Sequence, residues 1–417
     1  MRIHSGKSSP KCRFCGEGLE HTLVDLGMSP LCESYVKQEQ LNQMEPFYPL
    51  HVHVCKNCFL VQLEEYVRPE EIFTEYAYFS SYSDSWLEHA RTYTEKMIER
   101  FKLGGASHVV EVASNDGYLL QYFVKKNIPV LGVEPAKNVA DAAIGIGVPT
   151  LVEFFGEECA TRLRSEGKGA DLLLGNNVLA QVPDVNDFVK GMKILLNPRG
   201  VITMEFPHLL RLMEENQFDT IYHEHFSYFS FTTAERIFAA HGITLFDVEE
   251  LSTHGGSLRI YGRHAEDTAK AVSRGVQEMK RREEEYGFHR MSRYADFGDQ
   301  VKETKRKILE FLISARRRGK VVVGYGAPGK GNTLLNYCGI RTDFLDFTVD
   351  RNPYKQGKYL PGTHIPIYHP DRIRETRPDH VFILPWNFKD EIMGQLAYIR
   401  EWGGNFVVPI PEVKVFP

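Results

Sequence analysis

The chain has 417 residues, 42% of them hydrophobic and 25% charged, which is ordinary for a globular protein of about two to four domains. Its formal net charge of −5 argues against a general nucleic-acid-binding protein, which would usually be basic. No apolar run approaches the roughly 20 residues of a transmembrane helix, and the first ten residues lack the apolar core of a secretory signal. We therefore expect a cytoplasmic protein without a membrane or nucleic-acid partner, in which the seven cysteines serve as metal ligands or buried thiols.

Two C-x2-C pairs lie near the N-terminus, where Cys12 is followed by Cys15, and Cys55 by Cys58. Four thiolates are a ligand set for tetrahedral zinc, and a site with four protein ligands leaves no open position for chemistry. We therefore expect a structural zinc, with two redox motifs or a coincidence of spacing as the alternatives. The remaining cysteines are expected to be buried thiols: Cys32, Cys159 and Cys338.

An aromatic and hydroxyl-rich run, YAYFSSYS, covers residues 76–83. It has neither helical nor strand periodicity, and tyrosine and serine offer flat surface together with hydrogen bonds. We expect a binding loop, although aromatics that only fill the core of a connector would give the same pattern. The substrate contacts expected from it are Tyr78, Phe79, Ser80 and Ser81. Ser85 and Glu88 then form a capping-box pattern that starts an amphipathic helix.

The stretch VVEVASNDG, residues 109–117, reads as a buried strand, a turn of small residues and the start of a helix. Such a turn puts free backbone N–H groups beside the crevice where parallel sheets bind nucleotides. Only Gly117 is a glycine, and Asp116 would repel a pyrophosphate but suits an ammonium group. S-adenosylmethionine therefore fits this turn better than a dinucleotide does, the plain alternative being an ordinary strand–turn–helix.

The next predicted strand, residues 128–135, ends on Glu134, and an acid at this place can accept both hydroxyls of a ribose. Strands and helices continue to alternate as far as residues 201–206, which predicts a doubly wound parallel sheet with its ligands at the carboxyl ends of the strands. The expected cofactor contacts are Glu111, Ser114, Asn115, Asp116, Gly117, Glu134, Pro135 and Asn177.

A second candidate site is the segment DTIYHEHFSYFS, residues 219–230, in which two histidines flank Glu224 and Tyr222 precedes them. Histidine titrates near neutral pH and a tyrosine hydroxyl can donate to an enolate oxygen, so the cluster can deprotonate carbon. A metal site and an inert polar loop are the alternatives, and H-E-H lacks the helical spacing of a zincin. Downstream, THGGSLRIY predicts a glycine turn into an edge strand, where a contact of His254 with substrate and a purely structural turn stay open.

A charged segment from His264 to about residue 300 predicts a domain boundary, after which KVVVGYG at residues 320–326 starts a second α/β unit. Residues 324–329, GYGAPG, match G-x-G-x-x-G, and Asp350 follows at a strand end about twenty residues later, a pattern that suggests NAD. Lys330 equally suits a turn that contacts phosphate. The rival hypotheses are an NAD-dependent sugar-nucleotide oxidoreductase and a non-catalytic zinc protein whose degenerate nucleotide fold binds a partner.

Taken together, the chain resembles the S-adenosylmethionine-dependent C-methyltransferases of deoxysugar biosynthesis, which act on thymidine-diphosphate (dTDP) 4-keto sugars. The resemblance covers essentially the whole chain and looks closest to the C-3 methyltransferase of nitrosugar biosynthesis, which acts on a dTDP-3-amino-2,3,6-trideoxy-4-keto-hexose. It rests on the four N-terminal cysteines and on YAYFSSYSDSW, EVASNDG, GVEP, NNVLAQVPD, YHEHFSYFS, HGGSLR and GYGAPGKGN.

The resemblance implies an α/β protein of three domains: a zinc-binding domain over residues 1–75, a class I (Rossmann-like) methyltransferase domain over 76–264 and a second Rossmann-like domain over 265–417. It implies zinc and S-adenosylmethionine as cofactors, a dTDP-linked 4-keto deoxysugar as substrate, and Glu134 as the ribose ligand. We expect a monomer or a weak oligomer.

We expect the 4-keto group to acidify the C-3 proton of the sugar, a base to remove it, and C-3 of the enolate to attack the methyl group in line. We expect His225, or else Tyr222, to be that base. The resemblance implies that Lys330, Asn387 and Lys389 lie near the dTDP diphosphate or serve as scaffold. The family usually has histidine where this chain has Gln181, which can hydrogen-bond but cannot shuttle a proton at neutral pH. The expected catalytic set is Tyr76, Gln181, Tyr222, Glu224 and His225.

Overall fold

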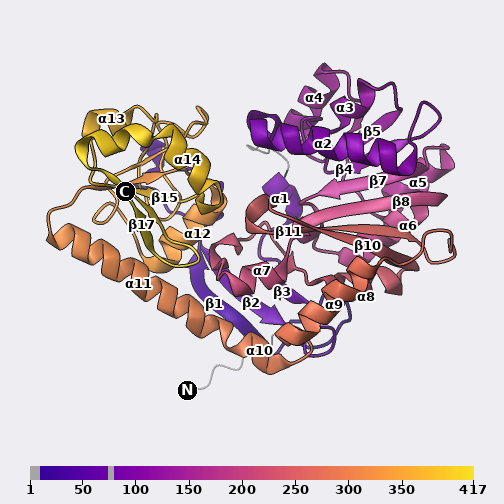
Figure 1. The fold of residues 1–417 in the computed structure, drawn as a ribbon, viewed down its shortest axis with the longest axis horizontal. Helices are drawn as coiled ribbons and strands as arrows, with labels where there is room; N and C mark the ends of the chain where they lie inside the picture. Colours follow the sequence, from indigo (N-terminus) through magenta and orange to yellow (C-terminus); the bar gives the residue numbers. More distant parts are fainter. Residues whose placement is uncertain (1–9, 74–78) are drawn as a thin grey trace. The chain divides into compact units, whose positions relative to one another are not determined.

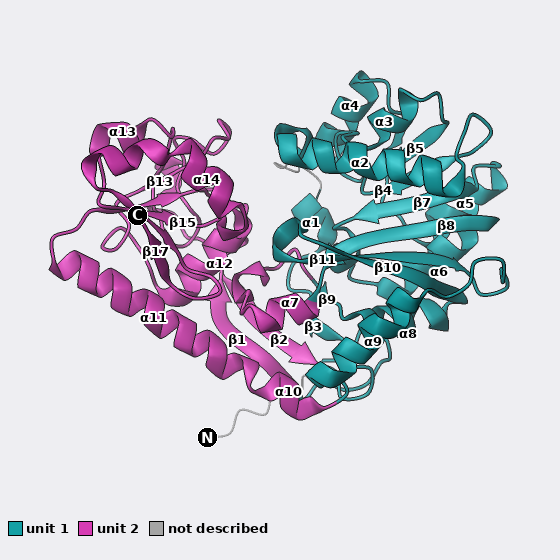
Figure 2. Ribbon diagram, in the orientation of Figure 1, with its two compact units in different colours: residues 1–20, 55–208, 226–289 teal, residues 21–54, 209–225, 290–417 magenta. Residues whose placement is uncertain are grey.

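The computed structural model describes residues 10–73 and 79–417 (Figure 1). The chain folds into two compact units, each assembled from three separate stretches of sequence (Figure 2). Unit 1 consists of residues 1–20, 55–208 and 226–289, and unit 2 of residues 21–54, 209–225 and 290–417. Tyr76 and Tyr78, expected to contact the substrate, lie outside the described residues. The domain boundaries at residues 75 and 264 stay predictions.

Unit 1 is built around a seven-stranded sheet with the order β10-β11-β8-β7-β4-β5-β6. The five strands from β8 to β6 are parallel, β11 is antiparallel to β8, and β10 is antiparallel to β11. The strands are β4 (Val109–Val112), β5 (Val130–Val133), β6 (Thr150–Leu151), β7 (Ala170–Asn176), β8 (Leu196–Pro207), β10 (Ile243–Leu251) and β11 (Ser257–His264). This confirms the predicted doubly wound sheet. The prediction that HGGS leads into an edge strand is wrong, because β11 is paired on both sides.

Alternate residues of the parallel strands enter two different hydrophobic cores, one on each face of the sheet. Val109 packs with α2 and α3, whereas Val110 packs with α5, α6 and α8. Ser83, rather than the predicted Ser85, caps α2, because its hydroxyl accepts the backbone N–H of Trp86 at 3.3 Å. The helices are α1 (Pro69–Phe73), α2 (Asp84–Phe101), α3 (Leu120–Val124), α4 (Lys137–Gly145), α5 (Glu157–Ser165), α6 (Val185–Leu195), α8 (Phe231–Ala240) and α9 (Arg274–Tyr286). The short strands β3 (Val61–Leu63) and β9 (Ser227–Tyr228) pair antiparallel.

Unit 2 contains the second sheet, with the order β14-β13-β12-β15-β16-β17. Its first five strands are parallel and β17 is antiparallel to β16. The strands are β12 (Val322–Tyr325), β13 (Thr348–Val349), β14 (Ile367–Tyr368), β15 (His380–Ile383), β16 (Asn405–Val408) and β17 (Lys414–Phe416). The order reverses at β12, so the crevice that a Rossmann-like sheet offers to ligands lies at the carboxyl ends of β12 and β15.

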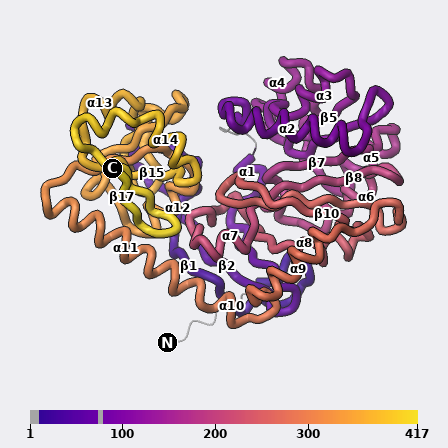
Figure 3. The backbone as a smooth tube through the Cα atoms, viewed as in Figure 1, coloured from indigo at the N-terminus to yellow at the C-terminus, as the bar shows by residue number. Residues whose placement is uncertain are grey.

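Segments from the first half of the chain complete unit 2. The antiparallel pair β1 (His21–Ser29) and β2 (Tyr48–Val54) belongs to this unit. Figure 3 shows β1 running beside α11, although the two are far apart in sequence. The helices are α7 (Leu209–Glu214), α10 (Met291–Ala295), α11 (Phe297–Arg317), α12 (Gly329–Cys338), α13 (Arg372–Thr376) and α14 (Lys389–Gln395). Across the described part of the chain, no helix is long and apolar enough to cross a bilayer.

Candidate functional site

The four predicted zinc ligands come together in unit 1, with their sulfur atoms all within 4.8 Å of one another. The Cys12 and Cys58 sulfurs are 3.6 Å apart, and those of Cys15 and Cys55 are 3.5 Å apart. Tetrahedral zinc with Zn–S bonds of about 2.3 Å requires sulfurs about 3.8 Å apart, so the donor set fits a closed structural site. The Cys58 thiol donates to the Cys12 sulfur and, together with the amide of Gln62, lowers the pKa of Cys12 to about 4.

The predicted cofactor turn follows β4, and its backbone is unusual. Ala113 has a φ of 55°, Asn115 of 50° and Gly117 of 75°, so two residues with a Cβ atom adopt left-handed conformations. Such conformations persist only where the surroundings hold them, and they are frequent at ligand sites. Glu134 helps to stabilise the backbone of this turn. One of its carboxylate oxygens accepts the N–H of Asn115 and the other accepts the N–H of Ala136, both at 2.9 Å.

The serines of the predicted binding loop hold the same turn from the other side. The N–H of Ser80 donates to Asn115 Oδ1 and the N–H of Ser81 to Asp116 Oδ2, each at 3.0 Å. Phe79 directly precedes this pair, and its ring stacks on Tyr82 with the centroids 5.4 Å apart. The contacts of Ser80 and Ser81 are therefore to the cofactor turn, and their contact with the substrate stays a prediction.

Several polar atoms at this turn are buried and, within the described residues, have no hydrogen-bond partner. They are Ser114 Oγ and Asp116 Oδ1 in the turn and, next to the end of β7, Asn177 Oδ1. The Glu111 carboxyl in β4 is buried as well, and the Tyr118 hydroxyl donates to it. Burial, with the nearby Asp116 and Glu134 carboxylates, raises the pKa of Glu111 well above its usual range, and the Tyr118 hydroxyl offsets only part of this. A buried group of acids without a cation is costly. The site therefore fits a ligand that brings positive charge and hydrogen-bond donors, as the ammonium and ribose groups of S-adenosylmethionine would.

Asn177 and His254, which the sequence assigned to cofactor and substrate, are in contact with each other. The side-chain amide of Asn177 donates to His254 Nε2 at 2.9 Å, and both residues have left-handed backbones. The His254 ring meets Trp86 edge-on at 5.4 Å, and Trp86 stacks on Tyr118, which directly follows the cofactor turn. His254 therefore lies at the cofactor side of unit 1, next to an aromatic cluster that the sequence did not indicate.

Pro135, another predicted cofactor contact, is half-buried between Glu134 and Ala136.

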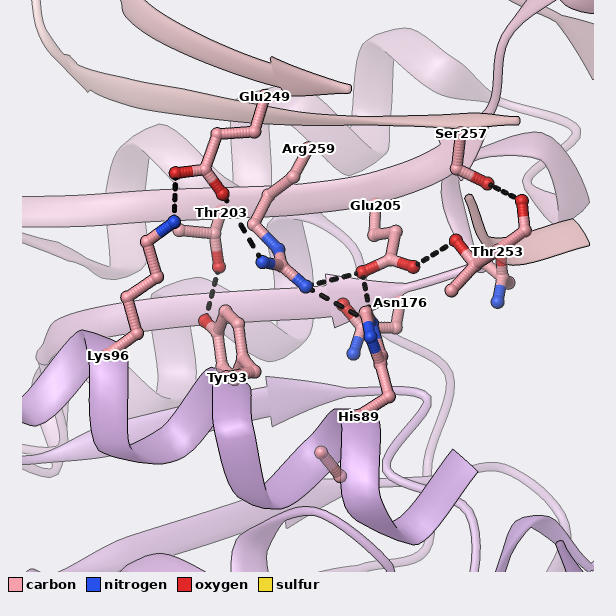
Figure 4. Close-up of polar contacts among 12 residues, drawn as sticks. His89, Tyr93, Lys96, Asn176, Thr203, Glu205, Glu249, Thr253, Ser257 and Arg259 are labelled. Carbon is pink, nitrogen blue, oxygen red and sulfur yellow. Dashed lines mark hydrogen bonds and ion pairs between the residues drawn. The ribbon is translucent and has the colours of Figure 1, made fainter. Parts of the chain in front are cut away.

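A buried charge network supports this wall of the site (Figure 4). Glu205, at the carboxyl end of β8, accepts from Arg259 at 2.7 Å, from Thr253 at 2.8 Å and from His89 at 2.9 Å. Burial raises the pKa of Glu205, but the bond from His89 and the charge of Arg259 outweigh it and lower that pKa to about 2. Sequence reasoning missed His89 and Arg259. The one available signal was that His89 lies three residues after Trp86, on the same face of α2.

Residues 219–225 of the predicted catalytic segment belong to unit 2, where several hydrogen bonds hold them, whereas residues 226–230 belong to unit 1. Trp386 donates its indole N–H to Asp219 at 2.7 Å, and the Thr333 hydroxyl donates to the carbonyl of Ile221 at 2.9 Å. His225 Nδ1 lies 3.1 Å from the carbonyl oxygen of Thr220. Since a carbonyl can only accept, Nδ1 carries the proton, and in the neutral ring Nε2 is the basic nitrogen.

The other side chains of this loop also make contacts within unit 2. The rings of Tyr222 and His225 are 4.2 Å apart, so two predicted catalytic residues are in contact. Glu224 accepts from the thiol of Cys32 at 3.3 Å, and His223 Nε2 donates to the carbonyl of Pro49 at 3.1 Å. Gln181, in the 3-10 turn Leu179–Gln181 of unit 1, is half-buried.

Lys330 and Asn387, predicted near a diphosphate, also meet in unit 2. Lys330 Nζ donates to Asn387 Oδ1 at 2.9 Å and lies 4.5 Å from the centroid of the Trp386 ring. Burial lowers the pKa of Lys330 to about 8, against the charge of Asp219. Lys389 is not part of this pair, since its ammonium group bonds Asp390 at 2.9 Å and is partly exposed.

Protein side chains fill the G-x-G-x-x-G turn of unit 2. A Cβ atom on Gly326 would lie 2.5 Å from Pro385 Cδ, and one on Gly329 would lie 2.9 Å from Cys32 Sγ. Asp350, at the position of a ribose ligand, accepts the N–H of Ala327 at 2.7 Å. The glycines therefore allow close packing of the protein on itself, and the geometry does not favour an NAD site here.

Comparison with known proteins gives matches along the whole chain. Three family models match in succession: "Putative zinc binding domain" over residues 12–73, "Methyltransferase domain" over residues 86–248 and "C-methyltransferase C-terminal domain" over residues 252–411. The chain is 36% identical over 405 residues to the C-methyltransferase NovU of Streptomyces niveus, covering 97% of this chain and 96% of that protein.

Two solved structures are similar to less than half of the chain. The magnesium protoporphyrin IX methyltransferase ChlM of Synechocystis, with bound SAM, is similar at a TM-score of 0.33 and 12% identity, over 42% of this chain and 78% of that one. The PH0226 protein of Pyrococcus horikoshii is similar at a TM-score of 0.36 and 14% identity, over 48% of this chain and 99% of that one.

Proposed function

Because the chain belongs to the C-methyltransferase family, we propose that it methylates C-3 of a dTDP-3-amino-2,3,6-trideoxy-4-keto-hexose with S-adenosylmethionine as donor. The observation that best supports the donor assignment is the pair of buried carboxyl groups of Glu111 in β4 and Asp116 in the turn that follows, of which Asp116 Oδ1 has no hydrogen-bond partner within the described residues. When bound, S-adenosylmethionine supplies a methyl group that its sulfonium charge already activates, so no metal is needed at the reacting carbon. A cytoplasmic location and a monomeric or weakly oligomeric state belong to the same proposal.

In unit 1, the chain's own residues bind and orient the donor. Glu134 stands at the end of β5, where its oxygens can accept the ribose hydroxyls while they hold the turn. Asp116 supplies negative charge for the ammonium group, and that group in turn favours the ionised form of the buried Glu111 carboxyl. Asn177 offers its unpartnered amide oxygen, and its amide nitrogen is fixed by His254. Ser114, Asn115, Gly117 and Pro135 complete the backbone of this site.

In unit 2, the 222–225 loop supplies the acid–base chemistry. His225 Nε2 takes the C-3 proton of the sugar, and the electron pair of the broken C–H bond moves to the C-4 oxygen as the enolate forms. The Tyr222 hydroxyl and nearby groups stabilise that oxygen. C-3 then forms its new bond to the methyl carbon while the pair of the carbon–sulfur bond returns to sulfur. Glu224, Tyr76 and Gln181 complete the catalytic set by hydrogen bonding.

The substrate's diphosphate is assigned to the Lys330 ammonium group, with Asn387 as its neighbour. The sequence pattern suggests six further substrate contacts, which belong to the same proposal: Tyr78, Phe79, Ser80, Ser81, His254 and Lys389. A lysine whose pKa lies at about 8 still bears its charge at pH 7, and a diphosphate would favour that charged form.

Calorimetry with two ligands tests the donor assignment. We expect S-adenosylmethionine to bind the whole protein with a stoichiometry of one and NAD not to bind. Glu111→Gln together with Asp116→Asn should weaken donor binding about tenfold or more, because the ammonium group loses both of its carboxyl partners. Binding of NAD without binding of S-adenosylmethionine would instead support the oxidoreductase hypothesis, and binding of neither would support the partner-binding protein.

A further inference from the structure

The thiol of Cys32 makes a contact that the reaction scheme above does not use. Cys32 follows β1, and it is only 3% exposed. Its Sγ donates to Glu224 Oε1 at 3.3 Å, and Glu224 is itself buried. Both residues belong to unit 2, although 192 positions separate them in the sequence.

Cys32 is a hydrogen-bond donor and not a nucleophile or a free thiolate. Burial, reinforced by the negative charge of Glu224, raises the pKa of Cys32 well above its usual range. The sulfur therefore keeps its proton at any pH where the enzyme works, and that proton points to the carboxylate. A thiol is a weak donor, so it orients a carboxylate while withdrawing little of its basicity.

The backbone around Cys32 is held by the start of α12 and by the turn that precedes it. The Cys32 carbonyl accepts from Asn332 Nδ2 at 2.5 Å, and the Tyr35 hydroxyl donates to the carbonyl of Ala327 at 2.6 Å. Gly329 leaves room for the sulfur, since a Cβ atom there would stand 2.9 Å from Sγ. The glycine-rich turn of unit 2, which in a dinucleotide-binding protein would approach a pyrophosphate, is thus used to hold a thiol in place.

We propose that Cys32 is a positioning residue, whose thiol holds the Glu224 carboxylate in the orientation that the catalytic loop needs. This inference rests on the proposed function, because it gives Glu224 its part in the reaction. Cys32 touches no reacting atom. It acts through Glu224, and it links the 222–225 loop to the rigid helix α12.

The kinetic test compares three single substitutions in the full-length enzyme. Cys32→Ala should lower kcat about tenfold or more with little change in KM for the sugar, as expected when a hydrogen bond to a charged group is lost. Cys32→Ser keeps a donor and should restore kcat to within about threefold of the wild type. Cys338→Ala is the matched control, because Cys338 is a buried thiol of α12 in the same unit. Equal kcat values for wild type, Cys32→Ala and Cys338→Ala would overturn the proposal, as would a Cys32→Ser enzyme as slow as Cys32→Ala.

A spectroscopic measurement keeps the proposal testable apart from activity. The S–H stretching band of Cys32 is identified in the infrared as the band that Cys32→Ser removes. In Glu224→Gln this band should move to higher frequency, because the acceptor is then a neutral amide in place of a carboxylate. An unmoved band would show that the thiol does not bond Glu224.

The same series separates this inference from the proposed function. If Glu224→Gln turns over like the wild type, the catalytic role of Glu224 falls, and the inference falls with it. If Glu224→Gln is impaired while Cys32→Ala is not, the proposed function stands and the positioning role alone is wrong.

Discussion

His225 is the side chain on which the proposed chemistry most depends. His225→Asn should lower kcat by about 10²–10⁴-fold, because asparagine can replace the bond to the Thr220 carbonyl but offers no basic nitrogen. Binding of S-adenosylmethionine, measured by calorimetry, should be unchanged, since the donor residues belong to unit 1. His223→Asn is the control in the same loop, and it should keep most of its turnover. Near-normal turnover of His225→Asn would remove His225 as the base.

Asp219 gives a prediction about pH. Burial raises its pKa from 3.8 to about 6, although the bond from Trp386 and the charge of Lys330 act in the opposite direction. A raised pKa in the folded state favours the protonated carboxyl, so the fold loses stability as the pH rises from about 4 to about 6.

Asp219→Asn removes that loss, because an amide stays neutral and still accepts from Trp386. Relative to the wild type, its free energy of unfolding in urea should gain up to about 3 kcal/mol between pH 4 and pH 7, since one pKa unit corresponds to about 1.4 kcal/mol. Parallel pH profiles for the two proteins would contradict this account of Asp219.

The role of a single residue could be predicted from the sequence where its position within a strand, turn or motif indicates that role. Glu134 ends a strand, Asp116 lies in the turn of a strand–turn–helix, and the four cysteines share one spacing. Cys32 and Arg259 could not be found in this way, because the partner that gives each its role is distant along the chain. The tautomer of His225 likewise depends on a carbonyl group that only the folded loop presents.

At the scale of elements, α2 is anchored to the sheet by buried charges. Glu205→Gln would remove the fully buried counter-charge of Arg259, whose side chain is 4% exposed, and leave it the more distant and partly exposed Glu249 at 3.5 Å. We expect it to lower the free energy of unfolding by about 3–5 kcal/mol, the usual cost of breaking a buried pair. Glu95→Gln, which breaks an exposed pair with Arg91 on the same helix, should cost less than about 1 kcal/mol. Equal effects of the two substitutions in urea unfolding would show that the network does not anchor α2.

The contribution of Glu205 to the stability of the fold also depends on pH. The pKa of Glu205 is lowered in the fold to about 2, so the stability that it contributes is present above its ordinary pKa and is lost as the pH falls toward 2.

Most strands and helices of both sheets could be predicted from periodicity, because burial on one or both faces leaves a local pattern of apolar residues. The pattern does not say which strands pair. The strand after HGGS was expected at an edge and instead pairs with both β8 and β10, because tertiary packing and not local sequence decides which strands are neighbours.

At the scale of the whole molecule, the zinc centre stabilises the fold of unit 1 and takes no part in methyl transfer. Three of its cysteines are part of the hydrophobic core that packs under the sheet. Removing the metal with a chelator should lower the melting temperature by about 10 °C or more, because the four cysteines lose the metal ion that cross-links them. Re-addition of zinc should restore it, and kcat below the transition should stay unchanged. A metal-free protein with the same melting temperature would contradict a structural role.

The assembly of each unit from three stretches could not be foreseen from the sequence. Composition and motifs suggested contiguous domains, yet β1 and β2 belong with α11 and α12, and residues 209–225 join the same unit. Nothing in a local pattern reveals a partner some 300 residues away, such as Asn332 for Cys32. The family resemblance carried the functional prediction because several separate motifs agreed on it.

The measurement closest to the central claim follows the methyl group itself. The protein is incubated with a dTDP-3-amino-2,3,6-trideoxy-4-keto-hexose and S-adenosylmethionine whose methyl group carries deuterium, and the sugar is examined by mass spectrometry and NMR. The account predicts a product that carries the labelled methyl group on C-3 and has lost the original C-3 hydrogen. An unmethylated sugar, or a label on nitrogen, oxygen or another carbon, would contradict it.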